Sequence, residues 1–248
     1  MKTLVIIPTY DEAANLESII RRVHEVQPSL DVLVADDGSP DGTGRIADRL
    51  AAADDRVFVM HRESKQGLGS AYRAGFAWGI ARRYDVLMEM DADGSHRPVD
   101  LAQILEASRA GADLVLGSRW VPGGGVVNWP WHRQLISRGG TMYARIMLGI
   151  PIKDATGGFR AFRRETLEAI DLDEVASQGY CFQIDMARRV VDAGRTVVEV
   201  PITFVERELG ESKMSGAIVR EALWRVTVWG LARIIRRSGD RRRSRTST

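Results

Sequence analysis

Two aspartates one residue apart, Asp91 and Asp93, are the residues whose type and spacing point most directly to chemistry. They follow the apolar run Val86–Met90, which is expected to form a buried strand. Neighbouring carboxylates repel each other, so the pair favours a divalent cation such as Mg²⁺ or Mn²⁺, which would neutralise a departing diphosphate. Taken alone, an Asp-x-Asp segment is equally compatible with a solvated turn or a helix cap.

Further acidic side chains follow two other apolar runs. Asp36 and Asp37 end one of them, and Tyr10 and Glu12 follow the run nearest the N-terminus, Leu4–Ile7. At such places carboxylates accept hydrogen bonds from a ribose or a nucleobase, and Tyr10 would pack on the base. Turn formation and helix capping explain any one of these groups. Three acidic strand ends on one edge of a sheet favour a nucleotide site.

Short apolar runs alternate with helical patterns along the first half of the chain. The predicted strands are Leu4–Ile7, Val32–Ala35, Val57–Met60, Val86–Met90 and Leu114–Leu116, and the predicted helices are Glu12–Val26, Gly44–Ala53, Gly69–Arg83 and Val99–Ala110. This alternation predicts an α/β fold with a mostly parallel sheet flanked by helices. Ligands bind at the carboxyl ends of the strands in such sheets, where the acidic residues lie.

The second half of the chain is less regular. A loop rich in Gly, Pro and Trp is expected at 119–131, helices at 132–148 and 182–193, strands at 159–162 and 197–200, and an edge extension of the sheet at 202–205. A helix over 216–237 and a disordered basic tail at 238–248 are expected to follow.

Charge is unevenly distributed along the 248 residues, although the net charge is only +2. Residues 233–248 hold seven arginines and one aspartate, a local charge of +6, and the rest of the chain carries 28 basic and 32 acidic residues. An acidic body with a basic tail argues against nucleic-acid binding and favours contact of the tail with an anionic surface. The single cysteine, Cys181, and the lack of a leader-like or spanning apolar stretch predict a cytoplasmic protein.

Several segments together carry a resemblance to family 2 glycosyltransferases with the GT-A (Rossmann-like) fold. The segments shared with the whole family begin at Val5, Asp36, Lys65, Met90 and Gly117. Those that resemble the polyprenyl-phosphate (dolichyl-phosphate) mannosyltransferases more narrowly are Asn128-Trp129-Pro130, Arg133 with Ser137, Gly157-Gly158-Phe159, Gly179-Tyr180 with Phe182-Gln183, and Arg207 followed by Gly210-Glu211-Ser212-Lys213. The resemblance covers roughly 3–215, which implies a catalytic domain over 1–215.

The resemblance implies roles for individual residues. It implies that GDP-mannose is held by Pro8, Tyr10, Glu12, Asp36, Asp37 and the segment Asp91-Ala92-Asp93, with contributions from Arg119, Arg207 and Lys213. Asp91 and Asp93 would bind the metal, and the third ligand would be Ser95, which is shorter and weaker than the glutamine of some members, or a water in its place. The acceptor phosphate would be held by Arg133, Ser137 and Arg207, so that Asp93, Arg119 and Arg207 carry the catalytic roles.

The acceptor decides the expected mechanism. A phosphate monoester is mostly a dianion at neutral pH and is already a nucleophile, whereas a sugar hydroxyl needs a general base. The expected reaction is therefore an in-line displacement with inversion, in which mannose passes from GDP-mannose to a polyprenyl phosphate without a required base; Asp185 is the candidate if a base is needed. A UDP-glucose-dependent enzyme with the same acceptor, and a non-catalytic nucleotide-binding module, are the alternatives.

The predicted C-terminal helix bears on location. Apolar residues including Leu223, Trp224, Val228 and Leu231 share one face of an amphipathic helix, and the arginines that follow would bind anionic lipid, at about 1 kcal/mol each. The sequence thus predicts peripheral attachment to the inner face of a membrane. Because some similar enzymes carry spanning helices after the catalytic domain, a separate membrane protein is a further expected partner.

Overall fold

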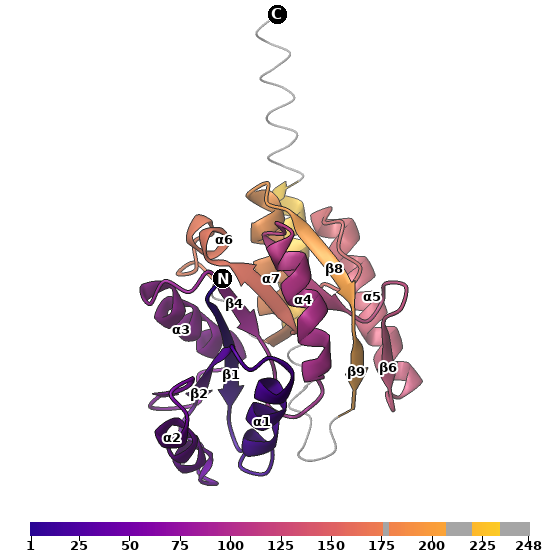
Figure 1. Ribbon diagram of the computed structural model, residues 1–248. Helices are drawn as coiled ribbons and strands as arrows, with labels where there is room; N and C mark the ends of the chain where they lie inside the picture. The colour runs from indigo at the N-terminus through magenta and orange to yellow at the C-terminus, as the bar shows by residue number, and fades with distance from the viewer. Residues whose placement is uncertain (176–178, 207–219, 234–248) are drawn as a thin grey trace, which may run out of the picture.

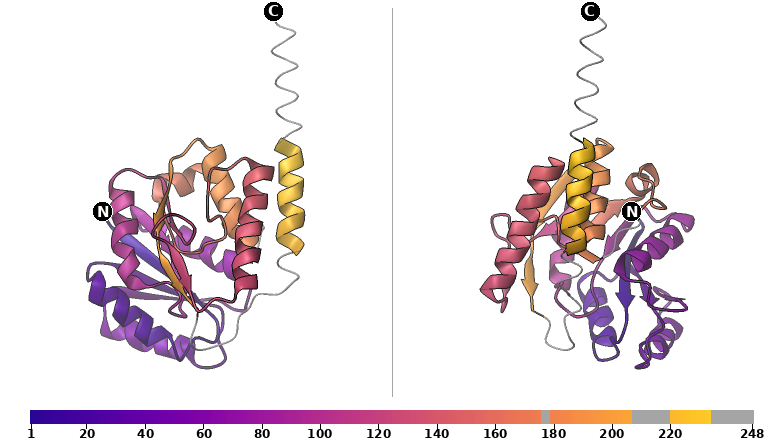
Figure 2. Two further views of the ribbon diagram at one scale, coloured as in Figure 1. Left: turned by 90° about the vertical axis from the view of Figure 1, so that its right-hand side faces the viewer. Right: turned by 180° about the vertical axis from the view of Figure 1, so that it is seen from behind.

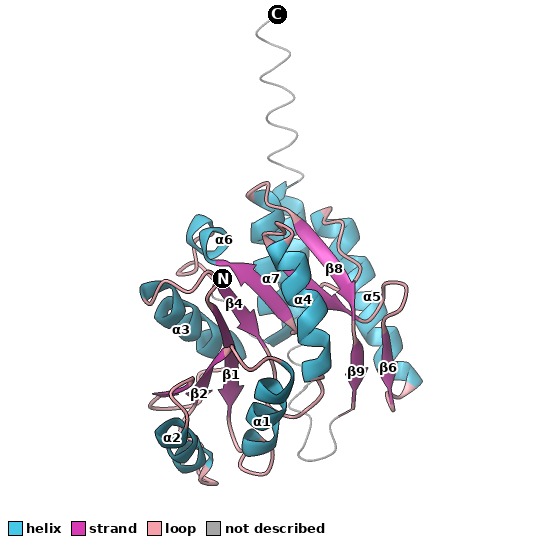
Figure 3. Cartoon of the chain, in the orientation of Figure 1, coloured by secondary structure: helices cyan, strands magenta, loops and turns pink. Residues whose placement is uncertain are grey.

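The computed structural model contains a seven-stranded sheet between two layers of helices (Figure 1, Figure 3). It describes residues 1–175, 179–206 and 220–233. The strands of this sheet are β1 (Thr3–Thr9), β2 (Asp31–Asp36), β3 (Val57–His61), β4 (Val86–Glu89), β5 (Leu114–Ser118), β7 (Arg160–Arg163) and β8 (Val197–Pro201). Their order across the sheet is β3-β2-β1-β4-β7-β5-β8. The predicted α/β fold is confirmed, and all five strands expected in the first half are present.

The sheet is buried on both sides, as continuous apolar strands require. Successive residues of β1 enter different cores: Leu4 and Ile6 pack on one face of the sheet, and Val5 and Ile7 pack on the other. Every strand pair is parallel except those of β7, which runs antiparallel to both β4 and β5. The sheet is therefore mostly parallel, and the start of β7 meets the carboxyl ends of its two neighbours.

Helices cover both faces of the sheet. One face packs against α3 (Leu68–Ala81), α5 (Trp131–Leu148), α7 (Gly179–Asp192) and the helix at 220–233, and the other packs against α1 (Leu16–Val26), α2 (Thr43–Ala53) and α4 (Leu101–Arg109). The 3₁₀ turn η1 (Pro98–Asp100) precedes α4, and the short helix α6 (Arg164–Ala169) follows β7. Figure 2 shows α5 and the helix at 220–233 side by side at one margin of the molecule.

Two expectations for the second half are wrong. The run at 202–205 does not continue the edge of the large sheet, because β9 (Thr203–Val205) pairs with β6 (Gly125–Val127) in a separate two-stranded parallel sheet. Consequently the segment at 119–131 contains a strand and is not a loop throughout. Each of these strands is three residues long, so neither carries a periodic signal, and the pairing joins segments far apart in the chain.

The C-terminal helix is described over 220–233, inside the predicted range of 216–237. The remainder of that range and the tail at 238–248 lie outside the described residues. Among the residues that the structure describes, no helix has the length and apolar character needed to cross a lipid bilayer.

Candidate active site

The acidic strand ends lie on one edge of the sheet, as the alternation of strands and helices predicts. β1 lies between β2 and β4 and is parallel to both, so the segments that follow these three strands leave the sheet side by side. In the register of β1 and β2, Thr9 lies opposite Asp36, and the Thr9 hydroxyl donates a hydrogen bond to Asp36 Oδ1 at 2.9 Å. From β1 the strand order runs to one side through β2 and β3 and then to the other side at β4. Doubly wound sheets bind ligands at this change in the strand order.

Asp36 and Asp37 are both buried and both have partners within the protein. Asp36 also accepts a hydrogen bond from the backbone N–H of Ser39 at 3.1 Å, which closes the turn after β2. Asp37 forms an ion pair with Arg62 at 2.5 Å, and although this pair lowers the pKa of Asp37, burial outweighs it and raises the pKa above its usual value. These carboxylates therefore stabilise the loop in which the predicted nucleotide contacts lie.

Tyr10 and Glu12 lie just beyond β1, where the sequence analysis places the nucleotide. The ammonium group of Lys65 lies 3.9 Å from the centre of the Tyr10 ring, so one face of that ring is covered by a cation. Glu12 accepts a hydrogen bond from the side chain of Asn15 at 2.9 Å at the start of α1. Pro8 is a residue of β1 itself.

The loop after β4 is shaped by His96. This side chain is buried and stacks on Phe159 with the ring centres 4.9 Å apart, and its Nδ1 accepts a hydrogen bond from the backbone N–H of Asp91 at 3.0 Å. Burial lowers the pKa of His96, so the ring is neutral and its proton lies on Nε2. Asp93 Oδ1 accepts from the backbone N–H of Ser95 at 3.0 Å, which turns the loop back toward the sheet.

The donor atoms of this loop suit a hard divalent cation. The side chain of Asp91 is 37% exposed, whereas Ala92 and Ser95 are buried, and the hydroxyl of Ser95 has no hydrogen-bond partner among the residues that the structure describes. Within the described residues, no three His, Cys, Asp or Glu side chains are grouped so that they could hold a metal ion. Asp91, Asp93 and Ser95 thus fit a cation whose coordination is completed by substrate oxygens or water.

Arg119 directly follows β5 and is held from one side by Asp154. The Nε of Arg119 donates to Asp154 Oδ2 at 2.7 Å, and its terminal nitrogen donates to Oδ1 at 2.6 Å and to the hydroxyl of Thr156 at 3.0 Å. Asp154 is fully buried and Arg119 is 4% exposed. A forked, buried ion pair of this kind fixes the direction of the guanidinium.

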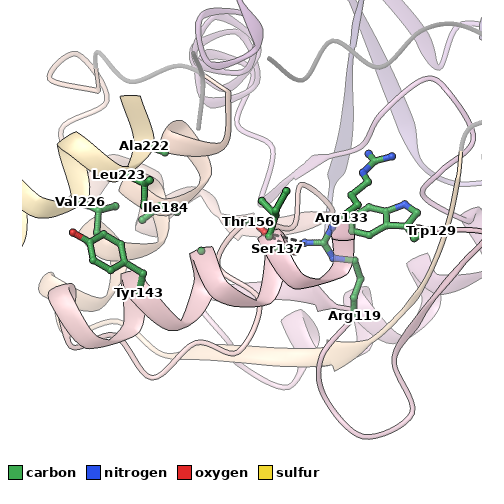
Figure 4. Close-up of a pocket in the computed structure, with 12 residues that line it drawn as sticks. Arg119, Trp129, Arg133, Ser137, Tyr143, Thr156, Ile184, Ala222, Leu223 and Val226 are labelled. Carbon is green, nitrogen blue, oxygen red and sulfur yellow. Dashed lines mark hydrogen bonds between the residues drawn. The ribbon is translucent and has the colours of Figure 1, made fainter. Parts of the chain in front are cut away.

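Arg133 and Ser137 lie with Arg119 at one end of a cavity (Figure 4). The hydroxyl of Ser137 is 3.4 Å from a terminal nitrogen of Arg119. Arg133 stacks over the Trp129 ring at 4.3 Å and donates to Glu206 Oε2 at 2.6 Å. The structure thus brings Arg133 and Ser137 of α5, which the resemblance assigns to the acceptor phosphate, together with Arg119 after β5, which the resemblance assigns to the donor.

The other end of the cavity is apolar. Its walls come from α5, α7 and the helix at 220–233, and they include Tyr143, Ile184, Leu223 and Val226. The cavity holds roughly 620 Å³ of space not filled by atoms, part of it open to solvent. The apolar end could not be predicted from the sequence, because it is built from helices distant in the chain. Asp154 could not be predicted either, because no local pattern connects it with Arg119.

The remaining residues with an expected role are Asp185, Arg207 and Lys213. Asp185 is 2% exposed on α7 and forms ion pairs with Arg188 at 2.7 Å and Arg189 at 3.2 Å, which favours a structural role. Arg207 and Lys213 lie outside the described residues.

Comparison with known proteins agrees with the family resemblance over most of the chain. Residues 4–171 match the model of a family described as glycosyl transferase family 2. The chain is 61% identical over 231 residues to a polyprenol monophosphomannose synthase of Mycolicibacterium smegmatis, covering 93% of this chain and 87% of that protein. It is 60% identical over 232 residues to an undecaprenyl-phosphate mannosyltransferase of Micrococcus luteus, covering 94% and 95% of the two chains.

More distant relatives share the fold. A dolichol-phosphate mannosyltransferase of Pyrococcus furiosus is 39% identical over 236 residues, which cover 92% of this chain and 64% of that protein. Among solved structures, glucosyl-3-phosphoglycerate synthase of Mycobacterium tuberculosis in complex with Mn²⁺, UDP-glucose and phosphoglyceric acid superposes with a TM-score of 0.66 at 21% identity, covering 92% of this chain and 79% of that one.

Proposed function

This chain belongs to glycosyl transferase family 2, and we propose that it transfers mannose from GDP-mannose to the phosphate of a polyprenyl phosphate, with inversion at the anomeric carbon. The observation that carries the proposal is the cavity next to the end of β5, which has two arginines and a serine at one end and apolar side chains at the other. An acceptor with an anionic head and a hydrocarbon chain matches both ends. The names of the three curated relatives support the same acceptor and the same sugar.

The acceptor phosphate binds between Arg119, Arg133 and Ser137 in this proposal, so Arg119, which the resemblance assigns to the donor, is proposed to contact the acceptor as well because it shares the cavity with Ser137. Arginine suits this task because its planar guanidinium offers two parallel donors to phosphate oxygens. Asp154 already orients Arg119, so that arginine needs little reorganisation when the phosphate arrives. Arg207 and Lys213, from the segment that follows Glu206, are proposed as further phosphate contacts on the resemblance alone.

The phosphate itself is the nucleophile. Its second pKa near ~6 leaves it mostly dianionic at neutral pH, so no side chain has to remove a proton. The ion pairs of Asp185 with Arg188 and Arg189 support this reading, because they commit that carboxylate to the helix on which it lies. Attack from the cavity, on the side of the sugar opposite the departing diphosphate, inverts the anomeric configuration.

The donor diphosphate lies against the loop after β4, where Asp91, Asp93 and Ser95 are proposed to hold Mg²⁺ or Mn²⁺. A cation bound there supplies charge neutralisation to the diphosphate as it departs. Supporting observations are the oxygen-only donor set, the buried Ser95 hydroxyl, which has no hydrogen-bond partner in the described part of the chain, and the presence of Mn²⁺ in several structures of the same fold. Asp93, Arg119 and Arg207 are the proposed catalytic residues.

The nucleoside is proposed to lie over the ends of β1 and β2. Tyr10 packs on the base, which requires Lys65 to leave the ring face that it covers or the base to use the other face. Pro8, Glu12, Asp36 and Asp37 line this end, and Asp36 and Asp37 act chiefly by fixing the turn through their bonds to Ser39 and Arg62.

A membrane surface is the proposed place of action, because the acceptor is a lipid. Two rows of exposed apolar side chains lie on the neighbouring helices α5 and 220–233 and are called here the apolar helix face: Trp131, Leu135, Met142, Ile146, Trp224, Val228 and Leu231. The two helices pack closely, since the hydroxyls of Tyr143 and Thr227 lie 2.6 Å apart. We propose that this face and the arginine-rich tail attach the enzyme to the cytoplasmic side of a membrane, alongside any separate membrane partner.

A donor screen tests the proposed function. The protein is incubated with a short polyprenyl phosphate, Mg²⁺ or Mn²⁺, and GDP-mannose, UDP-glucose or UDP-GlcNAc, and the lipid product and its anomeric configuration are determined. We expect β-linked mannosyl phosphate lipid from GDP-mannose alone. Preferential transfer from UDP-glucose would replace the proposed donor with the alternative one, and the absence of transfer from every donor would contradict an enzymatic role.

A further inference from the structure

Arg160 is a fully buried arginine that the proposed mechanism does not use. It begins β7 and lies opposite Glu89 of β4 in the register of the sheet, with its Nε 4.0 Å from Glu89 Oε2. Burial lowers the pKa of Arg160 to about 10, so the guanidinium remains charged at neutral pH. A buried charge is costly unless it is paired and hydrogen-bonded. The groups to which Arg160 donates hydrogen bonds therefore indicate which part of the structure it stabilises.

Within the described ranges, the Arg160 guanidinium donates three hydrogen bonds, and all three go to backbone carbonyls. Its Nε donates to the carbonyl of Gly157 at 2.7 Å, and one terminal nitrogen donates to that of Ala155 at 2.8 Å. The other terminal nitrogen donates to the carbonyl of Gln183 on α7 at 2.7 Å. One side chain therefore ties the segment 154–158, called here the acceptor loop, to both β7 and α7.

The acceptor loop carries the groups that orient Arg119. Asp154 and Thr156 both accept hydrogen bonds from the Arg119 guanidinium, at 2.6–3.0 Å. Their positions alternate along the loop with the carbonyls of Ala155 and Gly157, which Arg160 holds. A displacement of the loop backbone therefore moves the carboxylate that sets the direction of Arg119.

The partner of Arg160 belongs to the other half of the site. Glu89 ends β4 and precedes Asp91 by two residues, so the buried pair joins the strand that leads to the proposed metal loop with the strand that follows the acceptor loop. Both side chains are 0% exposed. At 4.0 Å this contact is electrostatic and not a hydrogen bond, so Arg160 constrains the strand that leads to the proposed metal loop less than its three hydrogen bonds constrain the acceptor loop and α7.

We propose that Arg160 is a positioning residue for the acceptor: by holding the acceptor loop it sets Asp154, and through Asp154 it sets the Arg119 guanidinium that receives the lipid phosphate. The proposal rests on the proposed function for the identity of the acceptor. It assigns to Arg160 no contact with either substrate.

Kinetics of Arg160→Met and Arg160→Lys test the proposal. We expect the KM for polyprenyl phosphate to rise about ten-fold or more in Arg160→Met, as for the loss of one or two hydrogen bonds to a charged group, with GDP affinity unchanged within about two-fold. Arg160→Lys keeps the charge and part of the hydrogen bonding, so its KM for polyprenyl phosphate should lie between that of the wild type and that of Arg160→Met. Arg163→Met is the matched control, because Arg163 lies on the same strand and donates to a carbonyl, that of Ser108, away from the acceptor loop.

A double-mutant cycle and hydrogen exchange separate positioning from general destabilisation. If Arg160 acts through Asp154, the effect of Arg160→Met on the acceptor KM should largely disappear in an Asp154→Asn background. Amides of 154–158 should exchange faster in Arg160→Met, while those of β1 and β2 keep their protection, a readout that does not need an active enzyme. The proposal would be overturned if exchange in the acceptor loop were unchanged, or if the acceptor KM rose and GDP affinity fell by the same factor. If the wild type transferred no sugar but the difference in exchange remained, the proposed function would be overturned instead.

Discussion

Glu206 and Arg133 form an ion pair inside the proposed acceptor site, with side chains that are 26% and 15% exposed. The incoming phosphate must compete with this carboxylate for the guanidinium. We predict that Glu206→Gln lowers the acceptor KM by up to about five-fold, since partly exposed pairs contribute up to about 1 kcal/mol. The effect should shrink at high ionic strength, because salt screens both the phosphate and the carboxylate.

Steady-state kinetics over a range of polyprenyl phosphate concentrations measure this effect. Glu174→Gln is a suitable control, because Glu174 pairs with Arg189 and its side chain is 70% exposed outside the cavity. A higher acceptor KM in Glu206→Gln would show instead that Glu206 orients Arg133 for the phosphate.

Asp93 is the residue on which the proposed metal site depends most. Its carboxylate also accepts the Ser95 N–H, so Asp93→Ala removes a proposed ligand and loosens the loop that presents the other two. We predict a loss of at least about 100-fold in kcat/KM, comparable to the loss of a group that stabilises transition-state charge. Isothermal titration of GDP with and without Mn²⁺ should show that Mn²⁺ no longer strengthens GDP binding.

Asp48→Ala serves as the comparison for Asp93→Ala, because Asp48 pairs with His61 on the surface of α2. A variant at Asp93 that keeps full activity, or that still binds GDP more tightly with Mn²⁺, would remove that carboxylate from the metal site.

Single residues differ in how far the sequence reveals their roles. Asp91 and Asp93 are recognisable as candidate metal ligands because their spacing and their place after a strand are local features. Asp154 and Glu206 are not, because each acts on an arginine that is distant in the chain, 35 residues away for Asp154 and 73 for Glu206. The resemblance located Arg133 and Ser137, whereas the ion pair that occupies Arg133 follows only from the fold.

At the scale of elements, α3 packs on the sheet through glycines. A Cβ on Gly79 would lie 2.4 Å from a methyl group of Leu87 and 3.0 Å from one of Leu4, and both leucines are fully buried. We predict that Gly79→Ala destabilises the protein, because overpacking costs about 1–3 kcal/mol, while the better helix propensity of alanine returns only about 1 kcal/mol.

Gly139 of α5 provides the opposite case, since a Cβ there meets nothing within 4 Å. Gly139→Ala should therefore stabilise the protein by up to about 1 kcal/mol through helix propensity alone. Urea unfolding followed by circular dichroism measures both variants. Equal effects in the two would mean that α3 does not press on the sheet as closely as its glycines indicate.

The elements that the sequence reveals are those with their own periodicity. The five parallel strands of the first half are predictable because each is a short, continuous apolar run buried on both faces. The antiparallel direction of β7 has no local signal, and β6 and β9 are too short to show one. The proposed acceptor site is built from α5, α7, the helix at 220–233 and the segments around Arg119 and Thr156, and no local pattern shows that these elements pack together. The proposed nucleotide site lies at the ends of strands that the sequence predicts, which makes it the easier of the two to locate.

At the scale of the whole molecule, the helix at 220–233 has two apolar sides. Val226 is buried and Trp229 packs against the core, with the Arg188 guanidinium 5.0 Å from its ring. Trp224, Val228 and Leu231 point away from the body and are 43–70% exposed. A helix that only packs on the body needs one apolar side, and Trp229 belongs to that side. The second apolar side, which carries Trp224, Val228 and Leu231, is left for contact with a separate surface.

If the apolar helix face inserts into lipid, its large side chains and the arginine-rich tail contribute separately to membrane binding. We predict that Trp131→Ser with Trp224→Ser weakens co-sedimentation with vesicles containing anionic lipid, and that the loss persists at high salt, because apolar insertion is not screened. Deletion of 233–248 should weaken binding chiefly at low salt, since basic residues act through the surface potential. Val99→Ser is the control, because Val99 is 60% exposed in η1, outside this face. Vesicle binding that depends equally on Val99 and on the two tryptophans, or that survives both changes together, would place the attachment elsewhere on the molecule.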